Sequence, residues 1–296
     1  MGFPFLWVGM ANFRTYLVLG RVSNLSTVWS NCLCAWLISG GGPWMAFAAL
    51  LAGSSCLYVA GMYLNDYCDA GFDAAHRADR PIPSGQIDRT SVLRIAIGLL
   101  VAGFALVAWA GEESLFFALL LVGLIIAYNL VHKRTVLGVP LMAGCRMGLY
   151  LLAGSAAADG LSDAAVWAGF LVFGYVLGVT ELARTESTTN RISRIGIGSI
   201  AVALLLTAGT GIGGAYGWAC ILPLFVVAAW IAYAFRRADS GGKLIVGKTI
   251  GPLLAGICLV DWAVLSTMHA FSIASLVAFL AFFIMALIAQ RRIPAS

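Results

Sequence analysis

The chain has 296 residues, of which 61% are hydrophobic and only 10% are charged. Ordinary soluble domains carry about 25% charged residues, so this composition excludes a soluble globular protein and indicates an all-α polytopic membrane protein. The net charge of +5 comes from basic residues spread over many short linkers. That pattern argues against nucleic-acid binding and suits contact with the anionic head groups of a lipid bilayer.

Along the chain, about ten stretches approach the roughly 20 apolar residues that a membrane span needs. They lie near residues 17–38, 43–66, 90–110, 114–131, 137–157, 164–182, 193–212, 216–235, 247–267 and 270–290. Arginine and lysine gather in alternate linkers, and cytoplasmic linkers carry the excess of these residues. We therefore expect both termini in the cytoplasm. Because the linkers are short, a single integral-membrane domain over residues 1–296 is predicted.

The second stretch ends in an unusual run of acids, NDYCDAGFD, at residues 65–73. Residues four apart share a face of a helix, so Asn65, Asp69 and Asp73 would form a ladder of oxygen ligands, with Asp66 one position round. Mg²⁺ is typically held by a few carboxylates together with water and phosphate oxygens. The run therefore predicts a site for Mg²⁺ and a diphosphate at a membrane surface.

The linker that follows, AAHRADRPIPSGQIDR at 74–89, brings cations beside these acids. Pro81 and Pro83 should stop the helix, and arginine forks such as those of Arg77 and Arg80 can neutralise phosphate oxygens that a metal does not reach. The alternative is a cytoplasmic linker whose charges only pair with one another. Acids and amides at helical spacing, followed directly by basic residues, favour the diphosphate clamp.

At this point the chain resembles a known family. The run at 65–73 followed by RPIPSG is similar to the first signature of the UbiA superfamily of intramembrane prenyltransferases, N-x-x-x-D-x-x-x-D, which Asn65, Asp69 and Asp73 match. Arg21 and Asn24 resemble the polar pair of the family's first helix. The segment YNLVHKR at 128–134, with Lys133 and Arg134, resembles its basic linker. Within the superfamily the chain is most similar to the EboC-like branch.

The resemblance implies a bundle of nine or ten transmembrane helices around a central cavity, in the bacterial inner membrane, with the active site facing the cytoplasm. It implies Mg²⁺ as cofactor, prenyl diphosphate as donor, and Asn65, Asp69 and Asp73 as catalytic residues. Asp66 would add a further metal ligand. The diphosphate would be bound by Arg77, Arg80, Lys133 and Arg134, and the substrate pocket would include Arg21, Asn24, Tyr63, Tyr128 and Tyr150.

The second acidic motif of the family is altered in this chain. The corresponding stretch, GVTELARTES at 178–187, contains no aspartate, and Glu181 and Glu186 are five residues apart. On an ideal helix they would point about 140° apart. Either one glutamate completes a weaker metal position, or the helix breaks and both reach inward. The alternative is that these acids are balanced by Arg184 and Arg191 and bind no metal.

A few other polar residues lie inside predicted spans, where an ionisable group is a candidate for function. Arg146 is about nine residues into the fifth span and is expected either to bind phosphate or acceptor, or to pair with a buried acid. Asp261 is expected to be a structural partner. Asn24 and Asn31 are seven apart and share a face. His76 and His132 lie in basic cytoplasmic linkers, where the alternatives are contact with phosphate or, as we expect, exposure to solvent.

We therefore predict an enzyme that transfers a prenyl group, with Mg²⁺, to a small or lipophilic acceptor whose identity the sequence does not give. Two alternatives remain open. One is a membrane protein that binds or transports a prenyl lipid without turnover, which the altered second motif would favour. The other is a transferase that moves a sugar phosphate to a polyprenyl phosphate.

Overall fold

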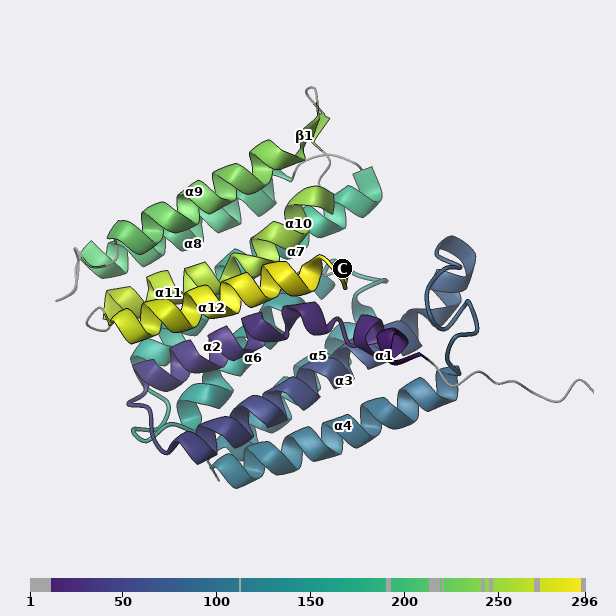
Figure 1. The fold of residues 1–296 in the computed structure, drawn as a ribbon, viewed down its shortest axis with the longest axis horizontal. Helices are drawn as coiled ribbons and strands as arrows, with labels where there is room; N and C mark the ends of the chain where they lie inside the picture. The colour runs from purple at the N-terminus through teal and green to yellow at the C-terminus, as the bar shows by residue number, and fades with distance from the viewer. Residues whose placement is uncertain are drawn as a thin grey trace, which may run out of the picture.

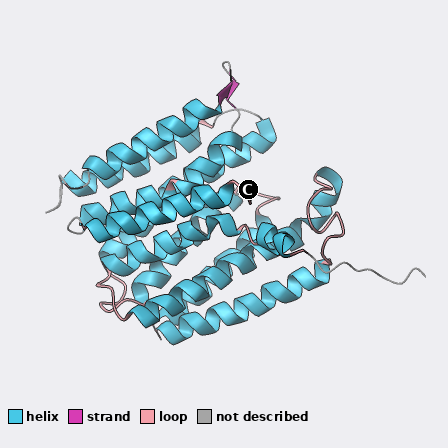
Figure 2. Ribbon diagram, in the orientation of Figure 1, coloured by secondary structure: helices cyan, strands magenta, loops and turns pink. Residues whose placement is uncertain are grey.

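A computed structural model describes residues 12–111, 113–189, 193–212, 219, 221–240, 243–244, 247–268 and 272–293. Its elements in chain order are α1 (Phe13–Leu19), the 3₁₀ helix η1 (Val22–Asn24), α2 (Leu25–Ile38), α3 (Trp44–His76), α4 (Arg89–Ala110), α5 (Ser114–Val131), α6 (Gly138–Ser155), α7 (Asp163–Thr189), α8 (Arg194–Ile212), α9 (Ile221–Ala238), the two-residue strands β1 (Asp239–Ser240) and β2 (Lys243–Leu244), α10 (Gly247–Ala255), α11 (Ile257–Met268) and α12 (Ile273–Gln290). Apart from the small hairpin of β1 and β2, the regular structure is helical (Figure 2).

The long helices form one layered bundle in which neighbours along the chain also pack together (Figure 1). The pairs α3 and α4, α5 and α6, α6 and α7, and α7 and α8 are in contact, and α2 links the layers by packing on α3, α6 and α11. The side chains of α11 are almost all buried, whereas α4 and α12 expose apolar residues over most of their length. An apolar exterior around a buried centre is what a lipid environment requires.

Helices occupy all of the predicted spans, with α10 and α11 together forming the ninth. Within the described residues, seven helical segments are long and apolar enough to cross a membrane: α3, α4, α5, α7, α8, the combined α10 and α11, and α12. The chain is thus an integral membrane protein with several candidate spans. The exact number of spans, nine or ten, stays a prediction.

The first predicted span, near residues 17–38, is wrong as a single helix. Helix α1 ends at Leu19, and α2 begins only at Leu25. Between them Arg21 has a left-handed backbone with φ of 42°, the one such non-glycine residue in the described part of the chain. This conformation is costly for a residue with a side chain. It persists here because the Arg21 side chain is held by residues of α3.

Helix α3 is the longest element and carries the acid run. Its 33 residues span about 50 Å at 1.5 Å per residue, more than the roughly 30 Å of a hydrocarbon core. It ends at His76, before Pro81 and Pro83, as predicted. Close contact with α4 fixes its position, since a Cβ atom on Gly53 would lie 2.9 Å from the carbonyl oxygen of Gly103 and 2.8 Å from Val107. Only glycine permits that approach.

Candidate active site

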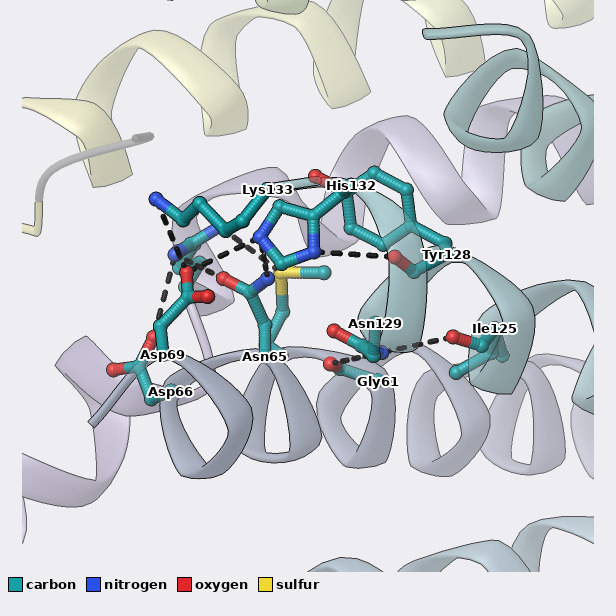
Figure 3. A network of polar contacts seen from close by, with 11 residues as sticks. Gly61, Asn65, Asp66, Asp69, Ile125, Tyr128, Asn129, His132 and Lys133 are labelled. Carbon is teal, nitrogen blue, oxygen red and sulfur yellow. Dashed lines mark hydrogen bonds and ion pairs between the residues drawn. The ribbon is translucent and has the colours of Figure 1, made fainter. Parts of the chain in front are cut away.

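The acid run lies on the buried face of the last turns of α3. Asn65, Asp66, Asp69 and Asp73 are all buried, and the most exposed of them, Asp69, retains only 7% exposure. In Figure 3 the side chains of Asn65, Asp66 and Asp69 point toward the same group of basic residues. The helical spacing therefore does what the sequence predicts, because it gathers several oxygen ligands on one side of one helix.

Arg21 binds the start of the run from the break between α1 and α2. Its Nη2 atom donates to Asn65 Oδ1 over 3.0 Å and to Asp66 Oδ1 over 3.3 Å. The second contact is also an ion pair between side chains that are both largely buried. The left-handed backbone at Arg21 thus directs a guanidinium at α3, which an uninterrupted helix would not do.

His132 and Lys133, at the end of α5, bind the middle of the run. His132 Nε2 lies 3.2 Å from Asp69 Oδ2 and 3.3 Å from Asn65 Nδ2, and Lys133 Nζ lies 3.4 Å from Asp69 Oδ2. Because His132 Nδ1 faces the Tyr128 carbonyl oxygen at 3.1 Å, that nitrogen carries a hydrogen. Nε2 then accepts from Asn65 in the neutral ring and donates to Asp69 in the imidazolium.

The expectation that His132 is simply solvated is therefore wrong. The ring is half-buried and stacks on Tyr128, with ring centroids 4.7 Å apart. The sequence held a usable signal, because Tyr128 and His132 are four residues apart and so share a face of the helix. His76, in contrast, is exposed and stacks on Phe72.

Asp73 provides the strongest indication that the run binds a cation. Its side chain is 4% exposed, and its Oδ1 atom has no hydrogen-bond partner among the described residues. A buried carboxylate oxygen without a partner is costly, and a metal ion with its water would satisfy it. The residues present therefore fit Mg²⁺, which takes oxygen ligands.

The acids do not form a closed metal cage. In the described part of the chain no group of three or more His, Cys, Asp or Glu side chains is arranged to hold a metal ion by itself. Mg²⁺ commonly binds through one or two carboxylates and completes its shell with water and phosphate oxygens. An open set of ligands on α3 is consistent with that mode, in which the phosphate substrate supplies part of the shell.

In the altered second motif, Glu181 has the partner that the charge-balance alternative predicts for it. Glu181 is buried, and Arg184 donates to both of its carboxylate oxygens, over 2.9 and 3.0 Å. Ser193 Oγ also contacts Glu181, at 3.4 Å. The side chains of Glu186 and Arg191 lie outside the described residues. The charge of Glu181 is thus already balanced by Arg184, which lowers its value as a metal ligand.

The other predicted diphosphate ligands are dispersed. Arg77 and Arg134 are exposed. Arg80 is half-buried and lines a cavity of about 540 Å³ between α1 and the loop after α3, together with Arg14 and Arg21. Among these arginines, Arg21 is the one that contacts the acid run directly.

A second cavity, of about 230 Å³, lies between α3, α5, α6, α7 and α10 and has mostly apolar walls. Three of the five predicted pocket residues, Arg21, Asn24 and Tyr128, line it. Tyr63 and Tyr150 do not belong to its lining. Tyr63 donates to the Tyr16 carbonyl oxygen over 3.1 Å, and Tyr150 is fully buried against another polar group. Both hydroxyls donate internal hydrogen bonds to residues distant in sequence, which patterns within one segment do not reveal.

That polar group is Asp261, on α11. Its carboxylate accepts hydrogen bonds from Ser30, from Asn31 over 2.9 and 3.0 Å, and from Tyr150 over 2.6 Å. The predicted structural role for Asp261 agrees with this arrangement. Arg146 does not pair with it directly: its Nη1 donates to Asn31 Oδ1 over 3.1 Å, so one amide joins the two charges.

These features define a class of protein: a membrane-embedded helical enzyme with a buried, metal-compatible acid run, flanking cations and an adjoining apolar cavity. The chain matches the model of the UbiA prenyltransferase family over residues 24–244. It therefore belongs to the UbiA prenyltransferase family, and prenyl transfer is its class of reaction.

Individual relatives are distant. The chain is 27% identical to a 4-hydroxybenzoate octaprenyltransferase of Burkholderia multivorans over 270 residues, which cover 86% of this chain and 93% of the relative. It is 28% identical to the protein described in the same words in Herminiimonas arsenicoxydans, over 79% of this chain and 82% of that one. The EboC-like branch does not appear among these relatives.

Two solved structures share the fold. A structure of digeranylgeranylglyceryl phosphate synthase in membranes aligns with a TM-score of 0.58 at 19% identity, over 86% of this chain and 97% of that one. The apo structure of a UbiA homologue from Aeropyrum pernix K1 aligns with a TM-score of 0.52 at 15% identity, over 93% and 98%. At these identities the likeness extends to the fold alone.

Proposed function

We propose that the protein transfers a prenyl group from a prenyl diphosphate to a small or lipophilic acceptor, with Mg²⁺, at the cytoplasmic face of a bacterial inner membrane. The observation that supports this most directly is the placement of Asp69 and Asp73. Both are buried, Asp69 contacts Lys133 and His132, and the Asp73 Oδ1 atom has no partner among the described residues. Such a carboxylate suits a metal that a diphosphate also binds.

In this proposal Asp69 and Asp73, with Asp66 or Asn65, hold Mg²⁺, which supplies Lewis-acid stabilisation of the diphosphate. Arg21 and His132 fix the ligand geometry by binding Asn65, Asp66 and Asp69. Lys133 stabilises the negative charge that develops on the departing diphosphate when the allylic carbon–oxygen bond breaks. Binding of Glu181 to the metal would further have to compete with its ion pair to Arg184.

The apolar cavity next to Arg21 and Tyr128 would receive the reacting end of the substrates. Its lining excludes water from an allylic cation, and the face of the Tyr128 ring can stabilise a positive charge by a cation–π interaction. The relatives described as 4-hydroxybenzoate octaprenyltransferases make 4-hydroxybenzoate the first acceptor to test.

The orientation is supported by the ends of the helices. Helices α3, α9 and α12 all end on the right-hand side of the bundle in Figure 1. Each is followed by, or ends in, arginines: Arg77 and Arg80, Arg236 and Arg237, and Arg291 and Arg292. Because cytoplasmic ends carry the positive excess, this end of the bundle, with the acid run, is assigned to the cytoplasm.

The test is an assay of purified protein with labelled prenyl diphosphates and 4-hydroxybenzoate. We expect Mg²⁺-dependent release of diphosphate that Asp69→Ala and Asp73→Ala abolish. Wild-type protein that binds prenyl diphosphate with Mg²⁺ but forms no product with any acceptor would support the second candidate, a binding protein without turnover. The ion pair of Glu181 with Arg184 favours that candidate, because it removes one expected metal ligand.

A further inference from the structure

Arg146 is an arginine in an otherwise mostly apolar cavity, away from the acid run. It lies eight residues after the start of α6 and is 7% exposed. Its guanidinium lies 5.7 Å from the centre of the Tyr58 ring, and both residues line the 230 Å³ cavity. Tyr58 precedes Asn65 by seven residues, about 10 Å along α3. Arg146 is therefore too deep to share a diphosphate with Asp69 and Asp73.

The position of Arg146 is fixed by hydrogen bonds on the side of its guanidinium that faces away from the cavity. Asn31 accepts from Arg146 Nη1 over 3.1 Å and donates to both oxygens of Asp261, over 2.9 and 3.0 Å. Ser30 and Tyr150 complete the shell of that carboxylate. An arginine supported in this way is preorganised, because the bonds behind it restrict its rotamers before any ligand arrives.

The same guanidinium is poorly satisfied on its cavity side. A guanidinium has five N–H donors, and Asn31 is the one hydrogen-bond acceptor that Arg146 has among the described residues. Water in the cavity can accept from the remaining N–H groups of Arg146. A hydrocarbon chain in the same place would exclude that water, and a buried donor without an acceptor is costly. The isoprenoid tail is therefore an unsuitable occupant of this end of the cavity.

We propose that Arg146 forms a recognition subsite for the prenyl acceptor, in which its free N–H groups bind a negatively charged oxygen of the acceptor, such as that of a carboxylate. Asn31 and Asp261 act as positioning residues behind it. This inference rests on the proposed prenyl transfer and specifies its acceptor as a molecule with an anionic group remote from the acid run. Arginine suits such a group because it can form two parallel hydrogen bonds to a carboxylate.

The test compares 4-hydroxybenzoate with its uncharged methyl ester. Binding to detergent-purified protein is measured by calorimetry, and prenyl diphosphate binding is measured separately in the same preparations. We expect wild-type protein to bind the acid at least about tenfold more tightly than the ester, a preference of about 1.4 kcal/mol. Arg146→Gln should abolish that preference and leave prenyl diphosphate affinity within about twofold of wild type.

Two further variants keep the experiment decisive. Arg146→Lys keeps the positive charge but not the planar pair of donors, and it should retain part of the preference for the acid. This variant distinguishes a loss of recognition from misfolding of Arg146→Gln. Arg94→Gln removes an exposed arginine of α4 and should change nothing. Equal preference for the acid in wild type and Arg146→Gln, or no preference in wild type, would overturn the subsite. If the wild-type protein did not bind prenyl diphosphate at all, the proposed function itself would be rejected.

Discussion

Arg21 Nη2 lies 3.0 Å from Asn65 Oδ1, although the two residues are 44 apart in sequence and the Arg21 backbone is left-handed. The contact couples the break in the first helical segment to the first member of the acid run. Costly backbone conformations of this kind cluster at functional sites, so the strain at Arg21 suggests a functional role for its contact with Asn65.

Arg21 is accordingly expected to be sensitive even to conservative change. In Arg21→Lys one ammonium replaces a planar guanidinium whose Nη2 binds Asn65 and Asp66 while its Nη1 contacts Met62 Sδ, and lysine does not reproduce that geometry. We expect weaker prenyl diphosphate binding by about 1.5 to 3 kcal/mol, the range for hydrogen bonds to charged groups. Titration of prenyl diphosphate in the presence of Mg²⁺ measures this. Affinity equal to wild type would show that the clamp is dispensable.

His132 is expected to matter through its ring nitrogen. In His132→Phe an aromatic ring can still stack on Tyr128, but the contacts with Asn65 and Asp69 are lost. We expect the turnover rate to fall by about tenfold or more, equivalent to about 1.4 kcal/mol. The initial rate of diphosphate release measures this. A rate close to that of wild type would assign His132 a packing role only.

The dependence of activity on Mg²⁺ should distinguish the roles of the two acidic motifs. Chelation with EDTA is expected to abolish diphosphate release, and added Mg²⁺ should restore it. If Asp73 is the metal ligand that we propose, Asp73→Asn should raise the Mg²⁺ concentration for half-maximal activity by about tenfold, because an amide oxygen is a weaker ligand than a carboxylate. Glu181→Gln should leave that concentration nearly unchanged, since Glu181 is already occupied by Arg184. If Glu181→Gln instead raised the Mg²⁺ concentration for half-maximal activity as much as Asp73→Asn, Glu181 would have to be a metal ligand.

The close contact between α3 and α4 gives a prediction about stability. In Gly53→Val the new side chain would meet Val107 and the Gly103 backbone, and we expect destabilisation of about 1 to 3 kcal/mol or more from overpacking. Gly98→Ala is the matched control, because nothing lies within 4 Å of the added Cβ. Thermal unfolding in detergent should show a lower midpoint for Gly53→Val alone.

The sequence predicted those parts of the site that depend on periodicity within one helix. Asn65, Asp69 and Asp73 are four apart, so any helix over this run places them together. It failed where two distant segments meet. The left-handed turn at Arg21 and the approach of His132 to Asp69 depend on packing of α1 and α5 against α3, and single-chain patterns do not encode such contacts. Glu181 shows the converse, since its partner Arg184 was visible three residues away.

The carboxylate of Asp261 has a consequence for the biogenesis of the protein. It joins α2, α6 and α11 through bonds that span up to 231 residues of sequence. During insertion in chain order, Ser30, Asn31 and Tyr150 enter the bilayer long before their acceptor is synthesised. Unsatisfied polar groups in hydrocarbon are costly, so the early helices remain an incomplete assembly until α11 arrives. The hydrogen bonds that support Arg146 through Asn31 are thus completed among the last steps of folding.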